Sequence, residues 1–456
     1  MTTTTIDVVD VIDRGRLGAL LCAVIGLCTL CTLIDGFDVQ AMSYVAPAVI
    51  KEWGIAKTEL GRVFGSGLVG MAIGALVFGS VADRVGRRPV LIGAMLFLAA
   101  FVYATARASS VQELLMLRFA TGLCMGAVIP NAIALAGEFS PARMRVTLMM
   151  IASSGLVLGG AVGGLVAAAL IPAFGWRSVF LAGAALPLLT VLVMLVALPE
   201  SLQFLATRRR GGEKMRGLLR RIDPALDMAG NAEFVVSERQ MKGAPFKHLF
   251  RDSLGLGTVL LWGVNFMNLM TAYFLANWLP VIMNEAGHST AQAVLAGTVL
   301  WIGGFIGNLF LGWCVDRRGF GQTLALTFVV AALAIAVIGQ VAGSLEAAFL
   351  VIAIAGFCVL GGQNAVNALA AVYYPTAMRS TGMGWALGIG RLGSILGPVV
   401  GGELLSLHWS SSSLFVAAAA PSILSLLAVF GFWFSGKLPA TKSAARAAAE
   451  VACAET

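Results

Sequence analysis

The sequence predicts an all-α membrane protein in which twelve transmembrane helices form two pseudo-symmetric six-helix bundles. Three observations carry this prediction: an apolar composition, twelve long apolar runs, and an internal repeat. Of the 456 residues, 59% are hydrophobic and only 12% are charged, and the mean hydropathy is +0.89. Soluble globular proteins carry about 25% charged residues. This composition therefore excludes an aqueous globular fold and makes the lipid bilayer the main solvent.

The apolar runs set the number and order of the helices. A helix needs about 20 apolar residues to cross the hydrocarbon core of a bilayer. Runs of that length lie at 17–49, 59–82, 89–107, 111–137, 146–171, 176–198, 254–283, 291–314, 321–342, 346–372, 380–407 and 411–436. We therefore expect an N-terminal tail (1–16), an N-terminal bundle (17–198), a polar connecting loop (199–253), a C-terminal bundle (254–436) and a C-terminal tail (437–456).

Basic residues are concentrated in the short loops on one side of the predicted helices. The loops after even-numbered spans contain Arg84, Arg87, Arg88, Arg143, Arg145, Arg317, Arg318 and Arg379. Because cytoplasmic loops carry the excess of Lys and Arg, we expect both termini and the connecting loop to lie in the cytoplasm. The net charge of +8 is then explained by the basic cytoplasmic loops, and we expect no nucleic-acid partner.

Two motifs recur in the same order in the two halves. The segment GSVADRVGRR (79–88), after the second run, is echoed by GWCVDRRG (312–319), about 233 residues later. The segment PARMRVT (141–147) is echoed by PTAMRST (375–381) at nearly the same offset. Repeated six-helix halves around a central substrate site are typical of transporters.

These motifs carry a resemblance to a known family. The segment GSVADRVGRR matches the loop signature of the major facilitator superfamily, and Asp35-Gly36-Phe37-Asp38 resembles the DGxD signature of its aromatic acid:proton symporters. The stretch 118–145 and the NWLP segment (277–280) are similar to that family as well. The resemblance implies transport roles for Asp35, Asp38, Arg118, Glu138, Arg379 and Arg391.

Charged residues within the first half form a candidate proton-coupling site. Asp35 and Asp38 are three residues apart and share a helix face. Arg118 is seven residues into the fourth span, about 10 Å below its outer end, so its depth is compatible with pairing to Asp38. Ionisable groups at membrane depth are costly and usually functional, which favours proton coupling by Asp35, Asp38 and Arg118. The alternative is a permanent structural ion pair.

The second half offers a candidate substrate site. Arg391 lies near the middle of the eleventh span with no acid close to it in sequence, and a guanidinium can hold a carboxylate through two hydrogen bonds. The alternative is that Arg391 pairs with Asp35 or Asp38. The candidate substrate-binding residues are Arg391, Asp38, Phe266, Asn268, Tyr273, Gln363, Asn364 and Trp385. The aromatic and amide groups suit a hydroxylated aromatic ring, although helix packing would also explain them.

A third group lies at the cytoplasmic ends of the predicted helices. Its members are Asp83, Arg84, Glu138, Arg143, Asp316 and Arg379. Carboxylates there can accept hydrogen bonds from helix N-termini and from arginines. We expect these residues to gate the cytoplasmic side.

Together these observations indicate a multi-pass transporter of the bacterial inner membrane. It would import an aromatic carboxylate such as 4-hydroxybenzoate or protocatechuate with protons, by alternating access, as a monomer without a cofactor or metal. A carrier for another organic anion, or a proton-coupled exporter, is the nearest alternative. Exporters often carry Gly-Pro in the fifth span, where this chain has Gly159-Gly160. A membrane sensor is a remote alternative. An enzyme is not expected, since no nucleophile–base constellation or phosphate loop is visible.

Overall fold

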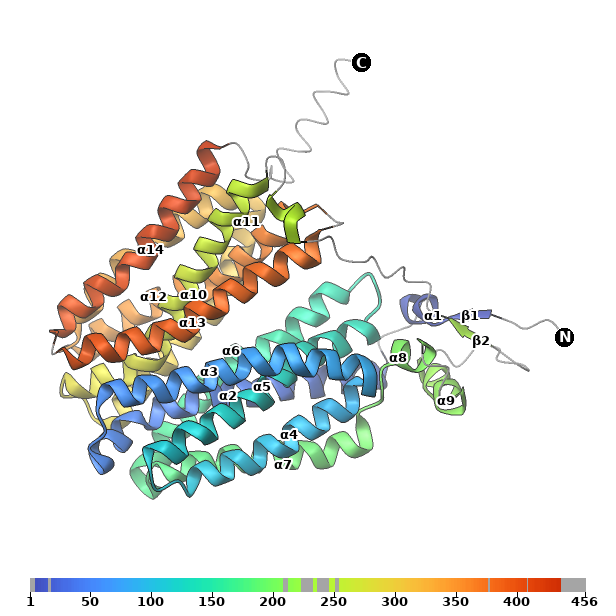
Figure 1. Ribbon diagram of the computed structural model, residues 1–456, viewed down its shortest axis with the longest axis horizontal. Coiled ribbons are helices and arrows are strands. Elements are labelled where there is room, and N and C mark those ends of the chain that lie inside the picture. Colours follow the sequence, from blue (N-terminus) through green and yellow to red (C-terminus); the bar gives the residue numbers. More distant parts are fainter. Residues whose placement is uncertain are drawn as a thin grey trace, which may run out of the picture. The chain divides into compact units, whose positions relative to one another are not determined.

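The computed structural model describes residues 5–14, 18–207, 212–222, 233–235, 246–250, 254–375, 378–407 and 409–435. The predicted C-terminal tail, part of the N-terminal tail and most of the connecting loop lie outside these residues. Within them the chain is almost entirely helical (Figure 1).

Eleven helices of the described chain are long and apolar enough to cross a membrane. They are α2 (Ala19–Trp53), α3 (Lys57–Val85), α4 (Arg87–Ala106), α5 (Val111–Phe139), α6 (Arg145–Phe174), α7 (Arg177–Ala197), α10 (Leu254–Glu285), α11 (Thr290–Val341), α12 (Leu345–Tyr373), α13 (Arg379–Ser406) and α14 (Ser411–Phe434). Pro and Gly occur inside several of them, as membrane helices tolerate. These helices confirm the all-α membrane fold.

Helix α11 accounts for the difference between eleven helices and twelve predicted spans. It contains 52 residues, which would measure about 78 Å if straight, far more than the roughly 30 Å hydrocarbon core. Gly319 interrupts it with φ 82° and ψ 169°, a conformation that a residue without a Cβ adopts readily. The predicted spans 291–314 and 321–342 are therefore the two arms of α11, one on each side of Gly319.

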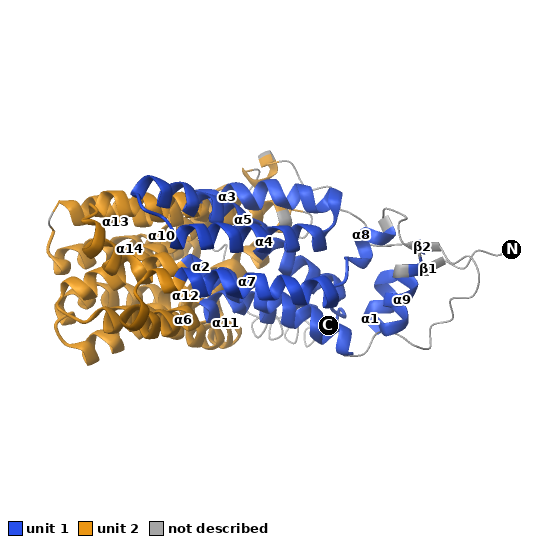
Figure 2. Ribbon diagram, turned by 90° about the horizontal axis from the view of Figure 1, so that it is seen from below, with its two compact units in different colours: residues 1–39, 69–159, 180–240 blue, residues 40–68, 160–179, 241–456 orange. Residues whose placement is uncertain are grey.

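The chain forms two compact units (Figure 2). Unit 1 comprises Met1–Val39, Val69–Gly159 and Phe180–Gln240, and unit 2 comprises Gln40–Leu68, Gly160–Val179 and Met241–Thr456. Unit 2 thus contains the C-terminal half of the chain together with one end of each of α2, α3 and α6.

Small residues allow the helices within each unit to approach closely. In unit 1, a Cβ added to Gly36 of α2 would collide with the backbone of Leu156 in α6. In unit 2, a Cβ added to Gly303 of α11 would collide with the backbone of Ala353 in α12. Such contacts are the usual basis of helix packing in membranes.

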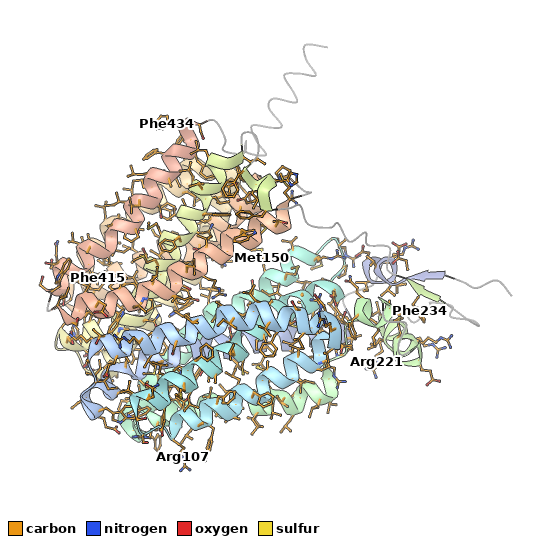
Figure 3. The ribbon with its side chains drawn as sticks, in the orientation of Figure 1. Arg107, Met150, Arg221, Phe234, Phe415 and Phe434 are labelled. Carbon is orange, nitrogen blue, oxygen red and sulfur yellow. The ribbon has the colours of Figure 1, made fainter. Side chains whose placement is uncertain are left out.

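The lateral surface of the helices is apolar. Met150 of α6 is 55% exposed and Phe434 of α14 is 88% exposed (Figure 3). Exposed apolar side chains occur along most of the long helices. A surface of this kind requires a lipid environment.

The remaining elements are short and lie in the segments that the sequence predicts as tail and loop. They are β1 (Thr5–Asp7), α1 (Val8–Arg14), α8 (Leu202–Thr207), α9 (Gly212–Ile222), β2 (Glu233–Val235) and the 3-10 helix η1 (Phe246–Phe250). Strands β1 and β2 pair in parallel, with Thr5 opposite Glu233. The sequence did not predict this pairing.

Candidate functional site

A buried ion pair joins α2 and α5 in unit 1. Arg118 Nη2 lies 3.2 Å from Asp38 Oδ1, and Arg118 Nη1 lies 3.3 Å from Asp38 Oδ2. The side chains are 4% and 2% exposed, so both charges are withdrawn from solvent. The two-pronged contact is the geometry in which a guanidinium and a carboxylate interact most strongly. The pairing predicted from the depths of the two residues is confirmed.

Two neighbours complete the environment of this pair. The guanidinium of Arg118 lies 5.2 Å from the ring centroid of Phe180 in α7, a cation–π contact that partly replaces hydration. Asp35 lies one helical turn before Asp38 and is fully buried. Removing one member of a buried ion pair leaves an uncompensated charge and costs about 3–5 kcal/mol. Separating Asp38 from Arg118 within the closed site would therefore be costly.

Unit 2 contains a network of neutral amides between α10 and α12. Asn268 Nδ2 donates to Gln363 Oε1 at 2.8 Å and to the carbonyl of Val359 at 3.0 Å. Gln363 Nε2 in turn donates to Asn265 Oδ1 at 3.0 Å and to Asn367 Oδ1 at 3.1 Å. Helix packing is the alternative role that the sequence indicates for these amides, and Asn268 and Gln363 do form hydrogen bonds between helices.

One acceptor in this network remains available. Asn268 is 1% exposed, and its Oδ1 atom receives no hydrogen bond from any residue that the structure describes. A buried carbonyl oxygen without a donor costs about 1–3 kcal/mol. A ligand hydroxyl is one group that would satisfy it.

The other predicted substrate-binding residues differ in their exposure. Phe266 and Tyr273 of α10 and Arg391 of α13 are half-buried, whereas Asn364 of α12 is exposed. Trp385 is 43% exposed and its ring lies in an aromatic cluster.

The aromatic cluster consists of Phe246, Phe250, Trp262 and Trp385. The ring of Trp385 lies 4.6 Å from that of Phe246 and 5.9 Å from that of Trp262, measured between centroids. The cluster joins η1, α10 and α13. The sequence did not indicate it, because Phe246 and Phe250 lie in the polar connecting segment.

The predicted gating residues lie at or next to helix ends, except Asp316, which lies inside α11 three residues before Gly319. Glu138, near the end of α5, forms a salt bridge with Arg87 at 2.6 Å. Arg87 belongs to the repeated GSVADRVGRR motif, yet sequence reasoning did not single it out as the partner of Glu138. The other predicted gating residues, Asp83, Arg84, Arg143, Asp316 and Arg379, are exposed.

A polar seam closes one end of unit 2, where α2 meets α10. Ser43 Oγ donates to the carbonyls of Ala276 at 2.7 Å and Asn277 at 3.0 Å. Gln40 Nε2 donates to the carbonyl of Ala276 at 3.2 Å. Lys57 at the start of α3 pairs with Glu285 at the end of α10 at 2.6 Å. These contacts join the first half of the chain directly to the second.

An aromatic contact extends the seam. Trp278 is fully buried, its Nε1 atom donates to the carbonyl of Pro398 at 2.8 Å, and its ring lies 5.4 Å from that of Phe64. Phe64 belongs to α3, so α3, α10 and α13 also meet here. The end of unit 2 that contains the seam is tightly packed.

Comparison with known proteins places this arrangement in a family. Residues 28–338 and 261–453 match the Major Facilitator Superfamily. The chain is 41% identical to a 4-hydroxybenzoate transporter, PcaK, of Pseudomonas putida over 87% of this chain and 89% of that protein. It is 38% identical to a gallate transporter of Pseudomonas putida, covering 87% and 88% of the two chains. A benzoate transport protein of Acinetobacter baylyi is 31% identical, with 87% and 86% covered.

Solved structures share the fold. A crystal structure of a D-xylose–proton symporter superposes with a TM-score of 0.68, at 17% identity over 93% of this chain and 99% of that chain. An inward-facing bacterial homologue of the lysosomal transporter Spinster gives a TM-score of 0.69, at 17% identity over 92% and 98%. The family match and the relatives show that the present chain belongs to the major facilitator superfamily of transporters and, within it, to the group of aromatic acid carriers. It is a transporter and not an enzyme.

Proposed function

We propose that the protein imports a hydroxylated aromatic carboxylate together with protons across the bacterial inner membrane, by alternating access. The observation that carries this proposal is the buried Asp38–Arg118 pair. The names of the relatives that transport 4-hydroxybenzoate, gallate and benzoate support the substrate class. The basic loops favour a multi-pass arrangement with both termini in the cytoplasm.

The pair links a proton to an anion through charge balance. When Asp38 takes up a proton, the positive charge of Arg118 loses its counter-charge in an environment with little water. Binding of an anionic substrate then becomes electrostatically favourable, because its negative charge offsets the uncompensated positive charge of Arg118. Asp35, buried one turn away, is the second candidate proton acceptor.

Substrate recognition falls to unit 2 in this proposal. Arg391 holds the carboxylate through its two terminal nitrogens, and Phe266 and Tyr273 contact the ring. The Oδ1 atom of Asn268, which receives no hydrogen bond within the described part of the chain, accepts one from a ring hydroxyl. A site built around such an acceptor discriminates against an analogue that lacks the hydroxyl.

Alternating access requires that one end of the transporter opens while the other is closed. The polar seam of Gln40, Ser43, Lys57, Ala276, Asn277 and Glu285 serves as the gate on the side that the loops assign to the exterior. Its few hydrogen bonds, each worth about 0.5–1.5 kcal/mol, are weak enough to break during a cycle. The predicted halves 17–198 and 254–436 are the bodies that move, and Asp83, Arg84, Glu138, Arg143, Asp316 and Arg379 gate the cytoplasmic side. We further propose that one chain suffices for transport.

The test is uptake of labelled 4-hydroxybenzoate into proteoliposomes under an imposed pH gradient, acidic outside. We expect accumulation that collapses when a protonophore dissipates the gradient and that is lost in Asp38→Asn. The variant Glu346→Gln, which neutralises an exposed carboxylate at the start of α12, serves as the matched control and should transport normally. Accumulation that ignores the gradient and survives Asp38→Asn would refute proton coupling.

The same preparation tests charge balance and direction. Moving one elementary charge across 100 mV is worth about 2.3 kcal/mol, so a cycle of one proton and one monoanion should be insensitive to an imposed voltage. Inhibition of labelled 4-hydroxybenzoate uptake by protocatechuate, gallate or unsubstituted benzoate shows which ring hydroxyl pattern the protein prefers. Substrate-driven acidification of the lumen supports import with protons, whereas alkalinisation supports exchange and an exporter.

A further inference from the structure

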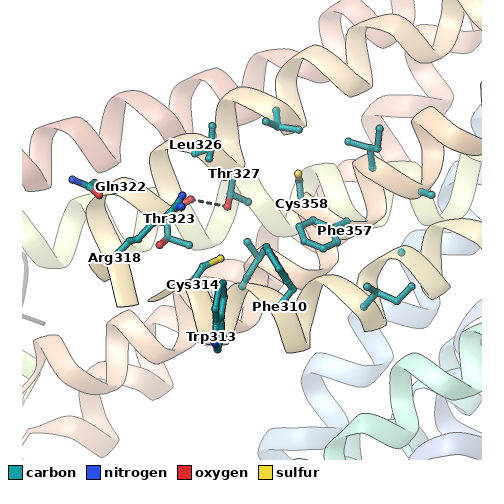
Figure 4. A pocket seen from close by; sticks show the side chains of 16 residues that line it. Phe310, Trp313, Cys314, Arg318, Gln322, Thr323, Leu326, Thr327, Phe357 and Cys358 are labelled. Atoms are coloured by element: carbon teal, nitrogen blue, oxygen red, sulfur yellow. Dashed lines mark hydrogen bonds between the residues drawn. The ribbon is translucent and has the colours of Figure 1, made fainter. Parts of the chain in front are cut away.

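A groove on unit 2 lies outside the polar sites described above. It occupies about 580 Å³ between the two arms of α11, with α12 as its floor (Figure 4). Its walls are formed mainly by apolar side chains, among them Ile306, Phe310, Leu326, Ile354 and Phe357. Ligand sites commonly have volumes of about 300–1,000 Å³, so the groove is large enough to hold a ligand.

The groove opens toward the surrounding membrane. Ile306 is 54% exposed, Phe310 is 50% exposed and Leu326 is 58% exposed. All three belong to the apolar arms of α11. A flexible hydrocarbon chain entering sideways from the bilayer would cover these side chains.

One end of the groove is polar. Arg318, Gln322 and Thr323 line it beside the Gly319 bend (Figure 4). Thr323 is 6% exposed, and its Oγ1 atom has no hydrogen-bond partner among the residues that the structure describes. The groove therefore combines an apolar channel with a cationic end and a buried hydroxyl without a partner.

The charges around this end favour an anion. Arg317 and Arg318 are both exposed, and the neighbouring acid is Asp316, so the bend carries a net positive charge. The guanidinium of Arg317 lies 4.3 Å from the ring centroid of Trp313. Tryptophan is enriched where the hydrocarbon core meets the headgroups, which places the bend at headgroup level.

We propose that this groove binds an anionic phospholipid, with one acyl chain between the arms of α11 and the phosphate at Arg318. Gln322 contacts the headgroup, and the hydroxyl of Thr323 donates to a phosphate or ester oxygen. Basic pockets between membrane helices are suited to acidic lipid headgroups, and the apolar walls match an acyl chain. The proposal does not depend on the substrate or on proton coupling.

The test uses the full-length protein in nanodiscs of phosphatidylcholine that contain a trace of photoactivatable lipid. The probe is phosphatidylglycerol with a diazirine on one acyl chain, and phosphatidylcholine with the same diazirine chain is the comparison. Mass spectrometry of the labelled protein locates the cross-links. We expect them on α11 between Ile306 and Leu326 and on α12 around Ile354 and Phe357, with phosphatidylglycerol favoured.

Two variants separate the headgroup from the chain. Arg318→Gln should lower labelling by phosphatidylglycerol about fivefold, the effect of one basic residue near an anionic surface. It should lower phosphatidylcholine labelling by a smaller factor, because the choline ammonium offsets the charge of that lipid's phosphate. Arg317→Gln removes the same charge from a neighbouring residue that does not line the groove, and it should lower phosphatidylglycerol labelling less than Arg318→Gln does. Ile354→Trp, which enlarges an apolar side chain of α12 that lines the groove, should abolish labelling at these positions by either lipid.

Other outcomes overturn the proposal. Equal labelling by the two lipids, or labelling indifferent to both Arg318→Gln and Ile354→Trp, would show that no anionic lipid is held there. Displacement of the probe by millimolar 4-hydroxybenzoate would assign the groove to an aromatic acid. Loss of labelling on dilution of the protein in the bilayer would assign it to a second copy of the chain.

Discussion

The two halves of the chain use corresponding helices to place polar groups inside the membrane, but with different chemistry. In the first half, the first and fourth helices, α2 and α5, hold the Asp38–Arg118 ion pair. In the second half, α10 and α12 hold the neutral network around Asn268 and Gln363. A charged pair responds strongly to a single proton, whereas an amide network does not ionise. The two halves thus differ in a way that can be tested, with a buried ion pair in one and a neutral hydrogen-bond network in the other.

Breaking the ion pair tests the charged side of this comparison and has the largest expected effect. Asp38→Asn leaves the charge of Arg118 buried without its partner, which costs about 3–5 kcal/mol of stability. We expect a marked fall in the apparent melting temperature in detergent, together with loss of uptake. Thermal unfolding followed by intrinsic fluorescence measures the first quantity.

A double variant separates stability from coupling. In Asp38→Asn/Arg118→Gln both charges of the pair are removed, so stability should largely return while proton-driven uptake stays absent. If the double variant recovers uptake along with stability, the pair is structural, as the alternative interpretation holds. If neither stability nor uptake recovers, the neutral amides cannot replace the charged side chains even in the packing of α2 against α5.

The amide network is expected to give a smaller and more selective effect. Asn268→Leu removes the donor to Gln363 and to the Val359 carbonyl, and leaving these acceptors unpaired costs about 1–3 kcal/mol. It also removes the Oδ1 acceptor proposed for the ring hydroxyl. We expect the KM for 4-hydroxybenzoate to rise relative to that for benzoate, as measured by competition in proteoliposomes.

Thr271→Ala is the control for this experiment. Thr271 is buried in α10, three residues from Asn268, and its hydroxyl donates to the carbonyl of Met267 in its own helix. It should lower stability slightly without changing the preference between the two acids. An equal rise in both KM values for Asn268→Leu would contradict a role in recognising the hydroxyl.

Helix number and depth could be predicted from the sequence because they depend on local quantities. The length of apolar runs located the helices, and the rise per residue placed Asp38 and Arg118 at compatible depths. The bend at Gly319 lies between the predicted spans 291–314 and 321–342. The structure merges them into one kinked helix without changing the number of crossings.

Contacts that depend on which helix faces meet could not be predicted in the same way. Phe180 lies in an apolar run where nothing marks it as the neighbour of Arg118. Several arginines of the basic loops could have paired with Glu138, and the structure selects Arg87. The ring of Trp385, a predicted substrate contact, packs against Phe246 from the connecting segment, and nothing in the sequence indicated this neighbour. For Phe180 and Arg87 the missing information is the rotation of a helix about its axis, and for Trp385 it is the position of the connecting segment.

The polar seam provides a third, intermediate test. Ser43→Ala removes a hydroxyl that donates to the carbonyls of Ala276 and Asn277, a loss of about 1 kcal/mol. If the seam is a gate, this shift favours its open form by about fivefold. The measurement is the labelling rate of Ala276→Cys by a membrane-impermeant maleimide added outside.

The same cysteine without Ser43→Ala supplies the baseline, and the unsubstituted chain supplies the background from its native cysteines. Ala276 is 2% exposed, so labelling requires the seam to open. A labelling rate unchanged by Ser43→Ala would mean that opening does not break these hydrogen bonds. The seam would then be a fixed part of unit 2.

The smallest effect is expected at the salt bridge between Lys57 and Glu285, and it sharpens the contrast with Asp38 and Arg118. Its atoms are closer, at 2.6 Å against 3.2 Å, but the side chains are 27% and 41% exposed. Exposed pairs contribute only about 0–1 kcal/mol because water solvates both partners and salt screens them. Glu285→Gln should therefore change the apparent melting temperature little, and any change should vanish at high salt. A loss as large as that of Asp38→Asn would show that distance, and not burial, decides which ion pairs matter in this protein.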